Sequence, residues 1–199
     1  MSLAIFFSET RFFDFLVLFL VAASFLLELL LARRGEAGKQ APLFKKLFLI
    51  STAIVVSYYF FLTYLQFWAW ENSGPLTRFF LPPHTGWWFL FDYWFIRFLL
   101  GYAISFLIAL VFVFSARKLN RRFGGRFFEA QEPWLGGLGL FLSGQPGWIF
   151  YLSLIFAIQL IRTGFGYLKR EKTKRFSFRY LWLPTAMFVI ILRVLGVIG

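Results

Sequence analysis

Two glutamates spaced three residues apart, Glu129 and Glu132, are the strongest candidates for chemistry in this chain. Two carboxylates at the mouth of a helix bundle can share one proton, so that one acts as a base and the other as an acid on a water molecule. Pro133 is typical of a first helical position, which also allows Glu132 to act as an acidic N-cap beside the positive end of the helix dipole. The pair therefore allows two interpretations, a helix cap and a candidate catalytic pair.

Other ionisable residues interrupt apolar segments, where charge is costly and raises a functional question. Asp14 follows Arg11 by three positions, so a local ion pair is expected. Glu28 lies near the end of its apolar segment and is expected to reach the adjacent interface. Arg162 and Arg193 lie within two turns of the ends of their segments, so their side chains are expected to extend into the polar interface.

Three more polar residues lie on the side of the predicted bundle opposite to Glu129 and Glu132. Asp92 and Arg97 are five positions apart, which does not place them on one helix face, and we expect them to anchor their segment at the interface. His84 lies in a Pro-rich connection and is expected to be solvated. With one His and no Cys, the chain excludes disulfides, thiolate chemistry and a histidine-based zinc site, so we expect no metal or cofactor.

The composition indicates an integral membrane protein. Of the 199 residues, 60% are hydrophobic and 24% aromatic, which a soluble globular domain does not reach. A net charge of +12 would suggest nucleic acid as a partner of a soluble protein. Here the charge falls in short connections between apolar runs, so we expect membrane lipid and no nucleic acid.

The apolar runs predict an all-α, polytopic bundle that forms a single transmembrane domain over residues 1–199. A helix needs about 20 residues to cross the hydrocarbon core. Residues 133–143 are too short to cross alone, yet the basic connections before and after them must share one side, which requires an even number of crossings between them. About six helices result, with the N-terminus and the C-terminus both outside: 12–32, 47–70, 90–115, 130–143, 148–168 and 180–198.

Basic residues give the predicted orientation. Short connections rich in Lys and Arg remain on the cytoplasmic side, and a multi-pass protein with loops of these lengths suits the cytoplasmic (inner) membrane of a prokaryote. Trp and Tyr, which favour the headgroup level, gather near the predicted segment ends and agree with the same orientation. The three basic stretches contain Arg33, Arg34, Lys39, Lys45 and Lys46; Arg117, Lys118, Arg121, Arg122 and Arg126; and Lys169, Arg170, Lys172, Lys174, Arg175 and Arg179.

Four pieces of the second half carry a family resemblance. GYAISFL at 101–107 opens a helix that ends in a basic loop, and LGLFL at 138–142 is followed by PGW at 146–148. A fifth helix then leads to a basic inner loop, and the last piece is RFSFRYL at 175–181, at the start of the final helix. In this order and spacing, residues 100–199 resemble the membrane domain of type IV prepilin peptidases, intramembrane aspartyl proteases that trim pilin leader peptides. The resemblance implies a shared arrangement of the last four helices.

The catalytic signature of that family, Gly-x-Gly-Asp, is missing. Counting back from Gly139 places Gln131 at the position of the catalytic Asp, and Glu132 is its neighbour. No Asp stands on the predicted inner side to match the family's second Asp, because Asp92 lies on the outer side. Glu129 and Glu132 are thus the only candidate substitutes for the family's aspartates. Ser177 and Tyr180 also replace the two prolines of the family's last motif.

The resemblance implies a diverged prepilin-peptidase-like protein, inactive as a peptidase, that binds or handles membrane-inserted, pilin-like helices. The partners would be small single-span membrane proteins with basic leaders, which could meet Glu129 and Glu132 directly. If the chain is an enzyme, it is a leader peptidase that uses these glutamates. Two alternatives remain open from the sequence, a structural subunit of a membrane complex and a small transporter.

Overall fold

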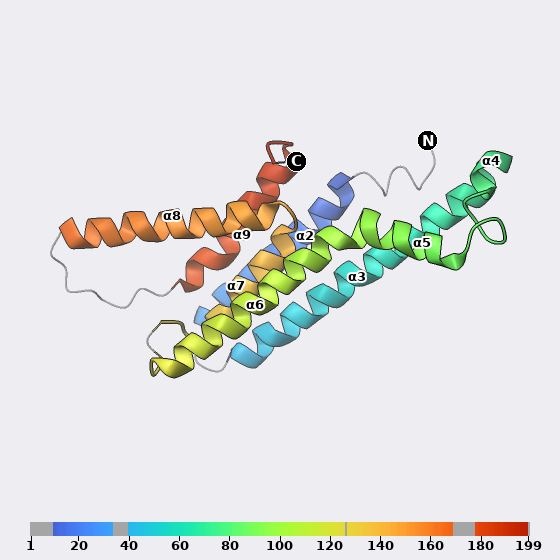
Figure 1. The fold of residues 1–199 in the computed structure, drawn as a ribbon. Helices are drawn as coiled ribbons and strands as arrows, with labels where there is room; N and C mark the ends of the chain where they lie inside the picture. Colours follow the sequence, from blue (N-terminus) through green and yellow to red (C-terminus); the bar gives the residue numbers. More distant parts are fainter. Residues whose placement is uncertain (1–9, 34–39, 126, 169–177, 199) are drawn as a thin grey trace.

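A computed structural model describes residues 10–33, 40–125, 127–168 and 178–198, and these residues contain helices and turns but no strand. The basic residues Arg34, Lys39, Arg126, Lys169, Arg170, Lys172, Lys174 and Arg175, together with Glu36 and Ser177, lie outside the described residues. The helices run in the order α2 (Thr10–Arg33), α3 (Ala41–Asn72), α4 (Pro75–Arg78), α5 (Trp87–Trp94), a π-helical segment η2 (Phe95–Leu99), α6 (Leu100–Arg122), α7 (Glu132–Ser143), α8 (Gly147–Leu168) and α9 (Arg179–Val194) (Figure 1).

Four stretches are long and apolar enough to cross a membrane: Phe12–Arg33, Ala41–Asn72, Trp87–Arg122 and Gly147–Phe165. The chain is therefore a multi-pass, all-helical membrane protein. The helices α7 and α9 contain 12 and 16 residues, about 18 and 24 Å of helix, and are shorter than a usual crossing.

Two helices extend beyond their predicted limits. The predicted segment 47–70 begins six residues earlier, at Ala41, because Pro42 suits the first turn and the interfacial Lys45 and Lys46 do not interrupt helical backbone bonding. The predicted segment 90–115 is one continuous run from Trp87 to Arg122, formed by α5, η2 and α6. In Figure 1 the far end of α3, α4 and α5 extends beyond the rest of the bundle.

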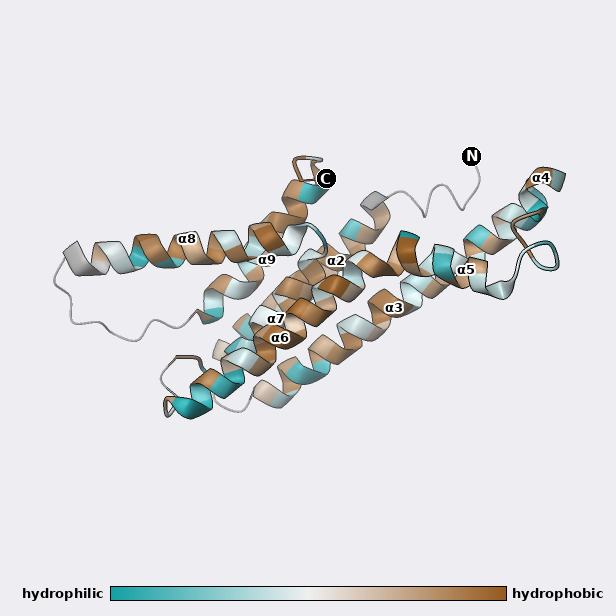
Figure 2. Ribbon diagram, viewed as in Figure 1, coloured by the Kyte–Doolittle hydropathy of each residue, from teal (hydrophilic) through white to brown (hydrophobic). Residues whose placement is uncertain are grey.

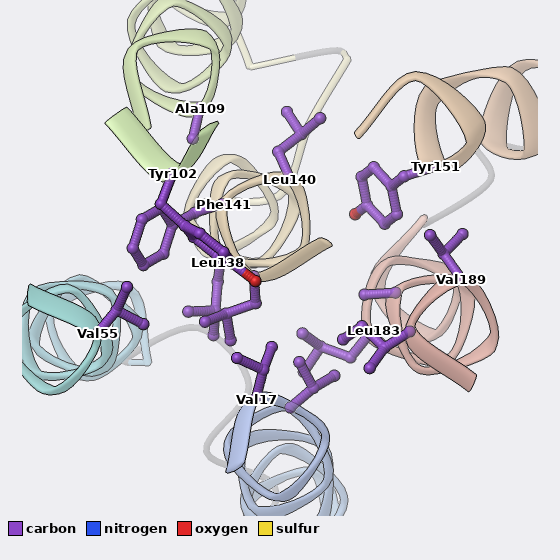
Figure 3. Packing of buried hydrophobic residues seen from close by; sticks show 14 of the residues in the cluster. Val17, Val55, Tyr102, Ala109, Leu138, Leu140, Phe141, Tyr151, Leu183 and Val189 are labelled. Carbon is purple, nitrogen blue, oxygen red and sulfur yellow. The ribbon is translucent and has the colours of Figure 1, made fainter. Parts of the chain in front are cut away.

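The short helix α7 is the centre of the bundle. Every residue of α7 except Trp134 is buried. Figure 3 shows its side chains Leu138, Leu140 and Phe141 surrounded by residues of α2, α3, α6, α8 and α9. A helix that is buried by protein on all sides can be short, since its ends need not reach the lipid headgroups.

Glycine allows α7 to approach its neighbours closely. A Cβ atom on Gly137 would stand 2.5 Å from Cγ2 of Val113 in α6, and one on Gly139 would overlap the hydroxyl of Tyr151 in α8. Small residues at such contacts let transmembrane helices pack backbone to backbone. The glycines of 136–139 therefore determine how α6 and α8 pack against the centre.

The helix α8 diverges from the bundle. Its first half packs against α7 and α9 through the buried Gly147, Tyr151 and Ile155. From 156 to 165 every side chain is exposed except Gln159, which is half-buried. Figure 1 shows this half of α8 pointing away from α2, α3 and α6.

Polar residues gather at the two ends of the bundle. Figure 2 shows hydrophilic colouring at the last turns of α6 and apolar colouring along its middle. At the end where α2 and α6 finish and α3, α7 and α9 begin, the described basic residues are Arg33, Lys45, Lys46, Arg117, Lys118, Arg121, Arg122 and Arg179. We call this the basic end.

Candidate functional site

A cluster of carboxylates lies at the basic end, and three separate segments contribute to it. Glu28 comes from the last turns of α2, Glu132 is the first residue of α7, and Glu129 belongs to the turn before α7. The charges of Glu129 and Glu132 both act on Glu28. Glu132 is thus near enough to Glu28, on another helix, for the two like charges to repel. We call Glu28, Glu129 and Glu132, with the residues that bind them, the carboxylate cluster.

Arg179, the first residue of α9, organises this cluster. Its Nε donates a hydrogen bond to Oε1 of Glu28 at 3.0 Å, and its Nη2 donates to Oε1 of Gln40 at 2.8 Å. The Glu28 and Arg179 side chains are 0% and 5% exposed, so the ion pair is fully buried. Glu28 therefore does not reach the interface as predicted, since Arg179 meets its charge inside the protein. Removing either partner would leave an uncompensated buried charge.

The two predicted site residues, Glu129 and Glu132, lie together, and their carboxylates accept hydrogen bonds from the segment before α7. Oε2 of Glu132 accepts a hydrogen bond from the Glu129 N–H at 2.9 Å, and Nε2 of Gln131 donates to Oε2 of Glu129 at 2.8 Å. Glu132 is therefore not the N-cap, because the helix begins at Glu132 itself and Gln131 precedes it. Its carboxylate instead reaches back three residues, as the acidic residue of a capping box does.

The geometry of the cluster favours a stabilising role over water activation. A hydrolytic pair needs two carboxylates that face one water and exchange a proton. Here Glu28 already accepts from a guanidinium, and Glu132 accepts from a backbone N–H. Both side chains are almost completely buried. Glu28 and Arg179 therefore connect α2 to α9, while Glu132 stabilises the turn before α7.

A second ion pair, largely but not completely buried, lies at the opposite end of the bundle. Nη2 of Arg193 stands 2.6 Å from Oδ1 of Asp14 and also donates to the Tyr102 hydroxyl at 3.1 Å, while Nη1 donates to the Ser143 carbonyl at 2.8 Å. The prediction for Arg193 is therefore wrong, since its side chain points inward, where Asp14, Tyr102 and Ser143 bind it. Asp14 pairs with Arg193. Its predicted partner Arg11 has a side chain that lies outside the described part, so that pair stays a prediction.

The two ion pairs align α2 and α9 in antiparallel fashion. Fourteen residues separate Asp14 from Glu28, and fourteen separate Arg179 from Arg193, so the pairs are about 21 Å apart along both helices. The sequence did not predict Glu28, Arg179 and Gln40 as site residues. The equal spacing of two acids in one apolar segment and two arginines in another was the signal that could have identified these pairs.

The remaining polar candidates do not join either ion pair. Asp92 and Arg97 are exposed on α5 and η2, and His84 is exposed with its ring 4.9 Å from that of Phe79. Arg162 is exposed on α8. Among the residues described, no group of three or more His, Cys, Asp and Glu could hold a metal ion.

Comparison with known proteins adds no relative. No protein-family description, curated protein or solved structure matches this chain. Its function is therefore inferred from its residues and their arrangement.

Proposed function

We propose that this chain is a six-crossing protein of a prokaryotic cytoplasmic membrane that binds single-span membrane proteins from the side and does not cut them. In this proposal it is a diverged prepilin-peptidase-like protein with both termini outside. The basic end lies at the cytoplasmic surface.

The number of crossings and the orientation have support in the arrangement of the helices. The helix α7 can serve as a short crossing because protein surrounds it, and the turns at 127–131 and 195–198 extend α7 and α9. The basic end carries eight described Lys and Arg residues, whereas Arg78, Arg97 and Arg193 lie toward the other end. Such asymmetry is typical of a cytoplasmic face.

Helix binding is supported above all by the unpacked half of α8. In the most apolar stretch of α8, 11% of the residues are buried, against 22% to 28% in the corresponding stretches of the other three long spans. Gln159 and Thr163 are four positions apart on one face of this half. Polar side chains on transmembrane helices form hydrogen bonds across helix interfaces, and a single transmembrane helix lying along α8 would supply such partners.

A basic leader would contribute less than the helix that follows it. Glu129 is the one carboxylate of the cluster that is not buried, so it can meet a leader from the cytoplasm. The surrounding arginines and lysines repel the same leader, and exposed charge pairs contribute about 1 kcal/mol or less. We therefore expect most of the affinity to come from contacts inside the membrane.

A permanent structural subunit is the second candidate, and the aromatic end of α3–α5 favours it. Several large side chains there are strongly exposed, and such surfaces can serve helix partners as well as lipid. They are Tyr64 at 64%, Trp68 at 47%, Leu76 at 79%, Trp87 at 68% and Trp88 at 73%. A subunit would remain bound to one partner throughout purification, whereas a handling protein would exchange its clients.

Leader-peptide assays with the purified protein test the proposal. We expect prepilin-like peptides, each with a basic leader and its transmembrane helix, to bind without cleavage, since Glu129 and Glu132 both already accept hydrogen bonds from the protein. The Glu129→Gln variant should weaken binding by only a few-fold, as one exposed charge pair is lost. Mass spectrometry of the peptides and binding to the immobilised protein provide the two readings.

The matched control is Glu71→Gln, which removes one negative charge at the opposite end of the bundle and should leave binding unchanged. Cleavage by the wild type that disappears in Glu132→Gln would contradict the proposal and establish a glutamate-based peptidase. Absence of both binding and cleavage would favour the structural subunit.

A further inference from the structure

A cavity of about 420 Å³ opens at the basic end, on the side of α6 and α7 where the positive residues lie. This volume is within the range of about 300–1,000 Å³ that is typical of small-molecule sites. The cavity lies between the start of α3, the end of α6 and the start of α7. Its lining residues are Ala41, Arg117, Asn120, Arg121, Gly125, Ala130, Pro133 and Trp134.

The charged residues among the described lining of this cavity are both basic. Arg117 and Arg121 are four positions apart, so both guanidinium groups stand on one face of α6, and none of the described residues that line the cavity is acidic. The Arg117 guanidinium lies over the Trp134 ring, 5.5 Å from its centroid, which orients it. Lys45 and Lys46 are exposed on the first turns of the neighbouring α3. An anion is therefore the favoured occupant.

The wall of the cavity is held in place by the protein itself. Asn120 donates through Nδ2 to the Phe128 carbonyl at 2.8 Å, and its Oδ1 accepts from the N–H groups of Phe127 and Phe128. These bonds join the last turn of α6 to the segment that precedes α7 and hold that segment in place. The turn itself requires Gly124 and Gly125, whose φ angles are +61° and +75°.

We propose that this cavity binds a phosphate group, presented by an anionic phospholipid headgroup or by a soluble phosphate compound. Two guanidinium groups on one wall match the several acceptor oxygens of a phosphate, and arginine binds phosphate through paired hydrogen bonds. Trp134 suits the headgroup level of a membrane, where its ring is buried and its N–H is wet. The site is independent of helix binding at α8.

Binding to the full-length protein in detergent tests the site with three probes: short-chain phosphatidylglycerol, short-chain phosphatidylcholine and inorganic phosphate. The Arg117→Gln/Arg121→Gln variant is expected to lose phosphatidylglycerol affinity by about ten-fold or more. The matched control, Arg78→Gln/Arg97→Gln, removes the same charge elsewhere and should remain within about two-fold. A second variant, Ala130→Trp, fills the cavity without changing charge and should weaken binding about as much.

The probes distinguish the source of the phosphate. Binding of phosphatidylglycerol without competition by inorganic phosphate supports a lipid headgroup, and effective competition supports a soluble phosphate compound. Equal losses in the two double-arginine variants would show that only overall charge matters, which would overturn the site. Unchanged phosphatidylglycerol binding in Ala130→Trp would overturn it as well. So would phosphatidylcholine binding as tight as phosphatidylglycerol binding, if neither double-arginine variant changed it.

Discussion

Replacing Arg179 by methionine is expected to lower the free energy of unfolding by about 3–5 kcal/mol. The substitution leaves the Glu28 carboxylate, which is completely buried, without its ion-pair partner, and it leaves Oε1 of Gln40 without a donor. The loss can be measured by thermal unfolding of the purified protein in detergent, monitored by size-exclusion chromatography.

Two further variants show whether the loss comes from the pair. Glu28→Met combined with Arg179→Met should be more stable than Arg179→Met alone, because replacing both charges leaves no uncompensated carboxylate. Arg33→Met, which removes an exposed guanidinium from the same end of α2, should change stability by no more than about 0.5 kcal/mol. If the double variant lost as much stability as Glu28→Met and Arg179→Met lose together as single variants, the ion pair would not connect α2 to α9.

Replacing Gly137 by alanine is expected to cost about 1–3 kcal/mol of stability. The added methyl would stand 2.5 Å from Cγ2 of Val113, so α6 and α7 would have to separate. Thermal unfolding in detergent measures this loss too, and Gly164→Ala is the control because nothing lies within 4 Å of its Cβ position.

The contact can also be restored from the other side. Val113→Ala removes Cγ2, so Gly137→Ala combined with Val113→Ala should lose clearly less stability than the sum of the two single losses. Strictly additive losses would mean that the two residues do not touch, and the close packing of α6 on α7 would be incorrect.

The general architecture was open to prediction because long apolar runs without charge allow few structures in a membrane. The predicted segments 12–32 and 148–168 agree with α2 and α8 within a few residues. The extension of α3 back to Ala41 was harder to predict, since Lys45 and Lys46 resemble a loop in sequence. A helix continues through such residues because its backbone bonds do not depend on side-chain polarity.

The candidate site was predicted only in part. Glu129 and Glu132 were identified because they are close in sequence, but Glu28 and Arg179 are separated by 151 positions, and their contact depends on tertiary packing. Asp14 was assigned to Arg11 because a partner three positions away seemed sufficient. A rule based on local spacing cannot take account of a distant partner such as Arg193, which only tertiary packing brings to Asp14.

Lateral binding of a transmembrane helix along α8 is the central claim, and photo-crosslinking in nanodiscs tests it most directly. A photoreactive amino acid would replace Leu160, which is 74% exposed on α8, and in a matched protein Leu107, which is 61% exposed on α6. Each protein would be reconstituted with one prepilin-like single-span protein that has a basic leader. We expect a crosslink to that protein from position 160, and lipid adducts alone from position 107. Equal crosslinking from both positions, or none from position 160, would contradict the claim.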